Sequence, residues 1–108
     1  MIRKRDTRPN PDSIDALSDQ VGDVCATLRA MANETRLRIL CVLFEGELPV
    51  NQIAEAVGQS LSAASQHLSK LKAEGLVASR RDGQTILYRS TGGVGTAVIQ
   101  TLCRFYQR

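Results

Sequence analysis

The spacing of apolar residues changes at Gly75, and that change limits the folds available to this chain. Before Gly75, apolar residues recur at intervals of three and four, as amphipathic helices require. After Gly75 come two short β-prone runs, residues 76–81 and 84–89, with Asp82-Gly83 between them. Asp-Gly readily adopts the positive φ angles of a two-residue hairpin turn. The sequence therefore predicts helices first and a β-hairpin after them.

Five helices are predicted, and caps and breaks set their ends. The first carries a narrow heptad-like apolar stripe from Ile14 to Met31, which a second subunit is well suited to cover. Asp12 or Ser13 is expected to cap its start. The predicted helices span residues 14–31, 34–45, 50–57, 61–74 and 94–106. The fold class is therefore mainly α with a β-hairpin, in the order α-α-α-α-β-β-α, which is a winged helix-turn-helix.

The basic residues concentrate in the second half of the chain. Residues 59–108 hold seven basic and two acidic side chains, whereas residues 9–58 hold three basic and eight acidic ones. A basic half beside an acidic one suggests a polyanionic partner. A solvated charged surface without a partner explains the same counts, so the positions of the charges have to decide between the two.

The predicted helix over residues 61–74 has the composition of a DNA-reading helix. Serines crowd its first turns, and small hydroxyls permit close approach to bases and phosphates. We expect Ser65, Gln66 and His67 to read bases. The alternative is a polar surface helix that is merely rich in serine, although serine is a mediocre helix former. The apolar stripe expected to face the core consists of Ala64, Leu68 and Leu71.

The predicted hairpin adds arginines beside this helix. Arg80 and Arg81 come just before the turn, where they suit contact with phosphates or the minor groove, and Lys70 is expected to meet the DNA backbone as well. Charged residues also protect edge strands from pairing with other chains, and the two roles are compatible. The candidate DNA-binding residues are Ser60, Ser62, Ala63, Ser65, Gln66, His67, Lys70, Arg80, Arg81 and Gln84.

The 108 residues fit one domain with one core. We expect residues 1–12, which are polar and basic, to form a mobile N-terminal arm, and residues 13–108 to form the DNA-binding and dimerisation domain. No run approaches the ~18–20 apolar residues of a membrane-spanning helix, and the charged start lacks the apolar stretch of a secretory signal. A cytoplasmic protein without a membrane partner is expected, with its three cysteines as free thiols.

Four segments together resemble the ArsR/SmtB family of small dimeric winged-helix repressors, over about residues 24 to 106. They are Ala-Met-Ala-Asn-Glu-Thr-Arg-Leu-Arg-Ile-Leu (30–40), Ser-Ala-Ala-Ser-Gln-His-Leu-Ser-Lys-Leu (62–71), Glu-Gly-Leu-Val (74–77) and Arg-Arg-Asp-Gly-Gln-Thr-Ile-Leu-Tyr (80–88). The resemblance implies a homodimer built from the first and last helices that reads an inverted repeat in double-stranded operator DNA. Its half-sites would lie ~34–36 Å apart.

Founding members of the family resemble metal sensors, so metal binding has to be considered. The arsenic and cadmium type carries Cys-Val-Cys after Glu-Leu, where this chain has Pro49-Val50-Asn51. The zinc type uses Asp and His pairs on the last helix, and residues 94–106 contain neither. The one histidine, His67, falls on the expected DNA-reading surface. We therefore predict no metal site and no cofactor.

The resemblance instead directs attention to the cysteines. Cys41 is placed as in the persulfide- and redox-sensing branch of the family, whose second cysteine would fall at Gln107 here. Cys103 lies one helical turn earlier on the same side. Our hypothesis is that a small thiol-reactive inducer oxidises these two residues, or joins them through a persulfide or polysulfide bridge, and thereby switches operator affinity. The alternatives are that Cys41 is a small buried hydrophobe, or that Cys25 is a third thiol in an As(III) or Sb(III) site.

Two other classes of function compete with a DNA-binding regulator. A winged helix used purely for protein–protein contact predicts no steep dependence of DNA binding on salt. An enzyme lacks support, because the sequence offers one histidine and no convergent carboxylates. A nucleophile–base pair of Cys41 and His67 would need two residues that are expected on different surfaces.

Overall fold

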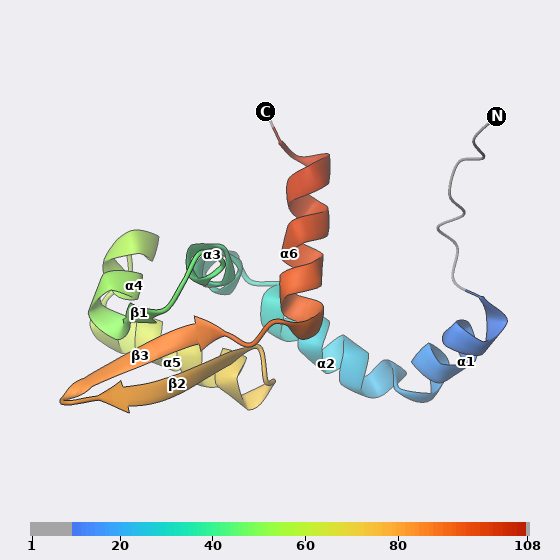
Figure 1. The fold of residues 1–108 in the computed structure, drawn as a ribbon, viewed down its shortest axis with the longest axis horizontal. Helices are drawn as coiled ribbons and strands as arrows, with labels where there is room; N and C mark the ends of the chain where they lie inside the picture. The colour runs from blue at the N-terminus through green and yellow to red at the C-terminus, as the bar shows by residue number, and fades with distance from the viewer. Residues whose placement is uncertain (1–9, 108) are drawn as a thin grey trace.

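The computed structural model describes residues 10–107. Three helices and a β-hairpin pack together as the winged domain, the first two helices project away from it, and the last helix stands beside it (Figure 1). This is the predicted mainly helical winged helix-turn-helix. The elements are α1 (Pro11–Asp19), α2 (Val21–Met31), α3 (Glu34–Leu43), β1 (Leu48–Pro49), α4 (Val50–Val57), α5 (Leu61–Ala73), β2 (Val77–Asp82), β3 (Thr85–Ser90) and α6 (Gly93–Phe105).

Side-chain caps and one glycine set the helix ends of the winged domain. Asn33 begins α3 by accepting the backbone N–H of Arg36 at 3.0 Å. Ser60 begins α5 in the same way, with its Oγ accepting the N–H of Ala63 at 3.1 Å. Gly58 ends α4 at a φ of 69°, a left-handed conformation that glycine adopts without steric cost. The turn between α4 and α5 is therefore fixed by local chemistry.

The core lies where α3, α4, α5 and β2 meet. Its largest fully buried side chains are Ile39, Leu43, Ile53, Leu68, Leu71 and Val77. The predicted inward stripe of α5 is confirmed, because Ala64, Leu68 and Leu71 all have 0% exposure. Burial of this stripe fixes which face of α5 is left for solvent and partners.

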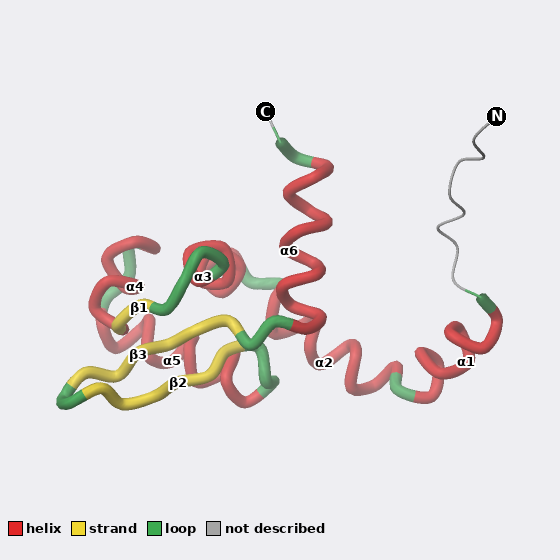
Figure 2. Tube along the Cα trace, in the orientation of Figure 1, coloured by secondary structure: helices red, strands yellow, loops and turns green. Residues whose placement is uncertain are grey.

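The predicted first helix is wrong in one respect, because it is two helices. The chain leaves helical geometry at Gln20 (φ −115°, ψ 17°), and Figure 2 shows the break between α1 and α2. Gly22, next to the break, is a poor helix former. The cap is also Asn10 and neither Asp12 nor Ser13, since Asn10 Oδ1 accepts the N–H of Ser13 at 2.8 Å.

The helix α1 begins within the last two residues of the predicted N-terminal arm. Pro11 and Asp12 belong to the helix, and Pro11 stands at the first helical position, where its fixed φ fits and no N–H is needed. Residues 1–9 of that arm lie outside the described residues.

The hairpin forms one residue later than predicted. Asp82 pairs with Thr85, so the two-residue turn is Gly83-Gln84. Gly83 has a φ of 64°, as the first central position of a type II′ turn requires. A third strand that the sequence analysis missed, β1, pairs with β3 and gives the order β1-β3-β2. Because β1 is only two residues long and one of them is a proline, it has no alternation of apolar and polar residues from which a strand could be predicted.

Candidate DNA-binding surface and thiol site

The face of α5 opposite the core stripe is polar and accessible. Gln66, Ser62 and Lys70 are exposed, whereas Ser65 and His67 are half-buried. Ser60 is exposed too; its Oγ accepts one hydrogen bond in capping the helix, and its hydroxyl proton and second lone pair are left for a ligand. The structure thus places the α5 residues predicted to bind DNA on one helix end and face, with Ala63 half-buried among them.

His67 has a partner that the sequence analysis did not foresee. The Nη1 atom of Arg36 lies 3.4 Å from His67 Nδ1, although 31 positions separate the two residues. Partial desolvation lowers the pKa of His67 from its ordinary 6.5, and the nearby charges of Arg36 and Lys70 lower it further. Both effects favour the neutral imidazole.

The two wing arginines differ in their surroundings. Arg80 donates from Nε and Nη2 to the two carboxylate oxygens of Glu47, at 2.9 and 2.8 Å. This two-point contact raises the pKa of Arg80 and lowers the pKa of Glu47. In the free chain the Arg80 guanidinium is therefore already bound to a carboxylate, and its contact with DNA stays a prediction.

Arg81 points to the other face of the hairpin, since neighbouring strand residues alternate. Ser79 shares that face, and its Oγ accepts a hydrogen bond from Lys72 Nζ of α5 at 2.8 Å. Arg81 therefore lies on the side of the wing that faces α5, and it forms no ion pair with any described residue. Gln84 is exposed in the turn itself.

Cys41 and Cys103 line the same apolar hollow between α3 and α6, with a volume of about 570 Å³. Gln107, the position of the family's usual second cysteine, lines it as well. Cys41 is exposed in the single chain, whereas the alternative expects it to be a buried hydrophobe. Desolvation in the hollow raises the pKa of the Cys41 thiol, and the nearby Cys103 raises it further. The remaining lining residues are Leu37, Ile99, Leu102 and Tyr106.

Cys25 does not line this hollow and is half-buried in α2. Between residues 10 and 107, no three His, Cys, Asp or Glu side chains come together in a way that would hold a metal ion. The three thiolates of the As(III) alternative are thus not assembled within one chain. Within the same range, no helix is both long and apolar enough to cross a bilayer.

A family model of bacterial regulatory proteins, the arsR family, matches residues 33–79, which run from the cap of α3 into β2. The transcriptional activator HlyU of Vibrio cholerae is 38% identical over 96 residues, covering 89% of this chain and 89% of that protein. The chain belongs to the ArsR family.

Two further relatives agree in sequence or fold. A biofilm growth-associated repressor of Xylella fastidiosa is 30% identical to this ArsR-family chain over 97 residues, covering 90% of it and 84% of the repressor. The structure of reduced HlyU from Vibrio cholerae matches with a TM-score of 0.79 over 86% of this chain and 98% of that one. The homodimeric winged helix-turn-helix domain Mb0332 of Mycobacterium bovis matches with a TM-score of 0.69 at 34% identity, over 92% and 91% of the two chains. The protein is therefore a DNA-binding transcriptional regulator.

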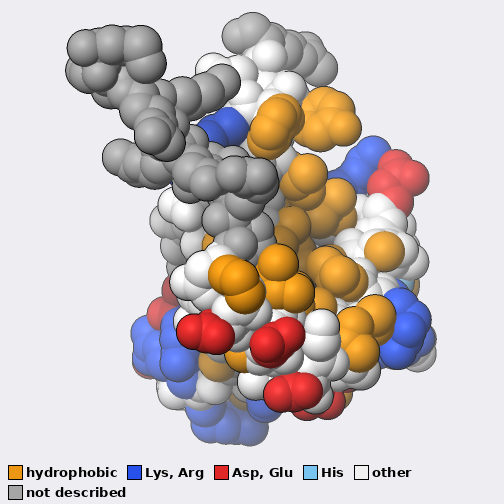
Figure 3. Space-filling view, turned by 90° about the vertical axis from the view of Figure 1, so that its right-hand side faces the viewer, with side chains coloured by type: hydrophobic (Ala, Val, Ile, Leu, Met, Phe, Trp, Pro, Cys, Tyr) orange, Lys and Arg blue, Asp and Glu red, His pale blue; other side chains and the backbone are white. Residues whose placement is uncertain are grey.

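The outer helices of this ArsR-family chain expose many large apolar side chains. Figure 3 shows hydrophobic side chains running along the face from which α1 and α2 project. Scattered exposed apolar residues are normal, but a run over neighbouring helices marks an interaction surface. The exposed residues on α1, α2 and at the two ends of α6 are Ile14, Leu17, Val21, Leu28, Val94, Leu102, Phe105 and Tyr106.

Proposed function

We propose that this ArsR-family regulator is a homodimeric repressor that binds an inverted-repeat operator and loses operator affinity when Cys41 and Cys103 are joined. The observation that carries the proposal is that both thiols line one hollow between α3 and α6. The polar face of α5, the wing and the exposed apolar outer helices support the DNA-binding and dimer parts of it.

A second copy of the chain is the partner that best suits the outer helices. Their exposed apolar side chains lie on three elements, α1, α2 and α6, whereas most of the basic residues that the structure describes lie on the winged domain. A twofold dimer formed there would direct two α5 helices to successive major grooves, ~34–36 Å apart. Mb0332, a chain of similar fold, is homodimeric, which supports a dimer here.

An organic trisulfide, R–S–S–S–R, exemplifies the inducer class. The Cys103 thiolate attacks the central sulfur and displaces one RS⁻, leaving Cys103–S–S–S–R. The Cys41 thiolate then attacks the same central sulfur and displaces the second RS⁻. The products are one Cys41–S–S–S–Cys103 bridge and two RSH, so the two thiols are oxidised by two electrons and the trisulfide is reduced by two. Burial and the nearby Cys103 raise the pKa of the Cys41 thiol, which disfavours its thiolate as the first nucleophile.

The bridge would act on DNA binding through packing. It would hold α3 against α6, and α3 also contacts α5. Like a bound ligand, the bridge shifts the equilibrium between two conformations only if its free energy differs between them. The bridge must therefore be compatible with only one relative position of α6 and the winged domain. We propose that the bridge cannot form in the relative position of α6 and the winged domain that binds DNA.

The test combines intact-mass spectrometry with operator titration on the wild type and on the Cys41→Ser, Cys103→Ser and Cys25→Ser variants. We expect the wild type and Cys25→Ser, the matched control, to gain one sulfur, lose two hydrogens and bind operator more weakly after treatment. Cys41→Ser and Cys103→Ser should keep full affinity. Bridging without any change in affinity, or loss of affinity in all four proteins, would refute the thiol switch.

A second experiment separates operator binding from a purely protein-binding role. The affinity of the wild type for duplex DNA should fall steeply as salt increases, because bound basic side chains release counterions. A monomeric protein without affinity for duplex at low salt would contradict the dimeric operator-binding proposal itself.

A further inference from the structure

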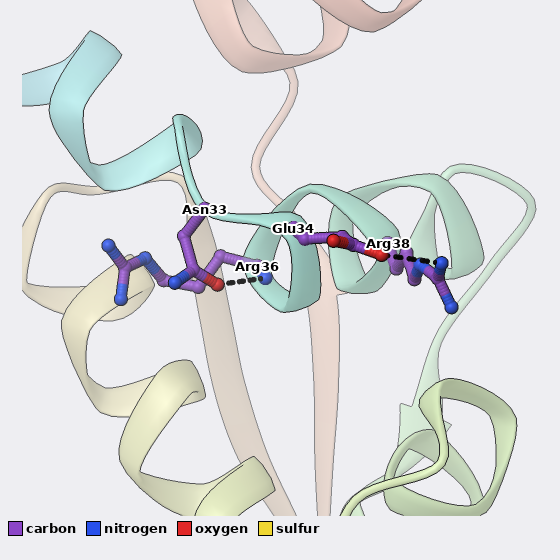
Figure 4. A network of polar contacts seen from close by, with 4 residues as sticks. All are labelled: Asn33, Glu34, Arg36 and Arg38. Carbon is purple, nitrogen blue, oxygen red and sulfur yellow. Dashed lines mark hydrogen bonds and ion pairs between the residues drawn. The ribbon is translucent and has the colours of Figure 1, made fainter.

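Arg36 makes contacts that none of the roles assigned so far requires. Its side chain leaves α3 on the side opposite to Arg38, as Figure 4 shows. Its Nε donates to the backbone oxygen of Ala30, in the last turn of α2, at 2.6 Å, and its Nη1 lies 3.4 Å from His67 Nδ1 on α5. One guanidinium therefore links the end of a projecting helix, the start of α3 and the predicted DNA-reading helix.

The chemistry of this contact fixes a proton. A guanidinium has donors and no acceptor, so in a hydrogen bond with Arg36 the Nδ1 atom of His67 must be the acceptor. A neutral imidazole carries one ring proton, which then resides on Nε2. Nε2 is the ring nitrogen that Arg36 does not contact, and His67 as a whole is only half-buried.

The charges around His67 favour the same state. Arg36 from α3 and Lys70 from α5 are the cations that act on the ring, and both oppose its protonation. Arg29 of α2 and Glu74, which follows α5, line the hollow next to these two residues. Desolvation is the main cause of the lowered pKa of His67, and the charges of Arg36 and Lys70 lower it further.

We propose that Arg36 is a positioning residue that holds His67 as its Nε2–H tautomer, so that α5 presents a hydrogen-bond donor to the operator. The proposal rests on operator binding by α5, as proposed above. A donor at this position selects acceptors such as guanine O6 and N7, thymine O4 or a phosphate oxygen, and it does not select the amino group of cytosine. Arg36 would thus act on base preference without touching DNA.

The first test needs no DNA. Nitrogen-15 NMR of the imidazole in wild-type protein should show Nε2 protonated and Nδ1 unprotonated at pH 7.5. Arg36→Gln should give a mixed tautomer population and a raised His67 pKa. Arg38→Gln is the matched control, because Arg38 lies in the same helix and is exposed in an ion pair with Glu34 at 2.7 Å. It should leave both readouts unchanged.

The second test uses a duplex selected by the wild-type protein from a random pool, with single-base variants of it. Both Arg36→Gln and His67→Gln should lower the discrimination against one base change by about two- to tenfold, which is the value of one hydrogen bond. The double variant should match His67→Gln alone, because Arg36 acts through the ring.

A protonated Nδ1 in the wild type would overturn the proposal, and that result depends on no variant being folded. Equal NMR shifts in Arg36→Gln and Arg38→Gln would overturn it as well. If the wild type selects no duplex, operator binding fails while the tautomer result stands, so the two failures are distinguishable.

Discussion

The wing offers a quantitative test of how the structure distributes charge for DNA binding. Arg81 faces the α5 side of the hairpin without an ion pair among the described residues, whereas Arg80 is bound at two points by Glu47. We therefore expect Arg81→Gln to remove a phosphate contact from each subunit. The double variant Glu47→Gln/Arg80→Gln removes a neutral pair and is expected to remove no phosphate contact.

The magnitude follows from counterion release. Each phosphate contact contributes about 0.9 to the slope of log affinity against log salt. Two subunits lose two contacts in Arg81→Gln, so the slope should become shallower by about 1.8. Between about 50 and about 200 mM salt, the wild type should then lose about 12-fold more affinity than Arg81→Gln does.

The assay is fluorescence anisotropy with one labelled operator duplex at four or more salt concentrations. The slopes for the wild type and for Glu47→Gln/Arg80→Gln should agree, and the slope for Arg81→Gln should be shallower. An equal loss of slope in both variants would refute the reasoning, since Arg80 would then contact phosphate in spite of Glu47. An unchanged slope in Arg81→Gln would show that the wing does not contact DNA through this residue.

Two further predictions concern stability. Asn33→Ala should cost about 1 kcal/mol by urea unfolding, because it removes the side-chain cap of α3, and Asn33→Ser should restore most of the loss. Since the folded-state pKa of His67 is lowered, its contribution to stability is complete above the unfolded value near 6.5 and is lost as pH falls through the folded value. The wild type should therefore lose stability relative to His67→Gln between pH 7 and pH 5, and parallel curves would contradict this.

Local chemistry made much of the winged domain predictable. The apolar stripe of α5 is buried, as its periodicity predicts. Asn33 and Ser60 cap helices, as expected from their side-chain oxygens. The hairpin was predicted from Asp82-Gly83, but its register is later by one residue because glycine occupies the first turn position with a positive φ. The break at Gln20 was missed, since an apolar stripe continues across it and conceals the end of α1.

The candidate site was predictable to a different extent in its three parts. The polar face of α5 follows from the amino-acid composition of residues 61–74 and from the helical period of their apolar residues. The position of Cys103 on the side facing Cys41 followed from helical geometry together with the family resemblance, and the structure places both residues in one hollow. No periodic signal indicated that Glu47 would bind Arg80, because Glu47 precedes a two-residue strand whose pairing partner lies far along the chain.

By itself, the sequence determined the helices and the hairpin of the winged domain and which side of α5 is polar, because these depend on interactions between residues a few positions apart. Tertiary packing alone decided that Arg36 meets His67 and that Arg80 meets Glu47, across 31 and 33 positions. Such contacts depend on how whole elements stack, and a side chain reaches its partner only after the core has fixed their distance. That is why the sequence indicates a DNA-reading helix, while the structure shows which of its polar groups are already engaged.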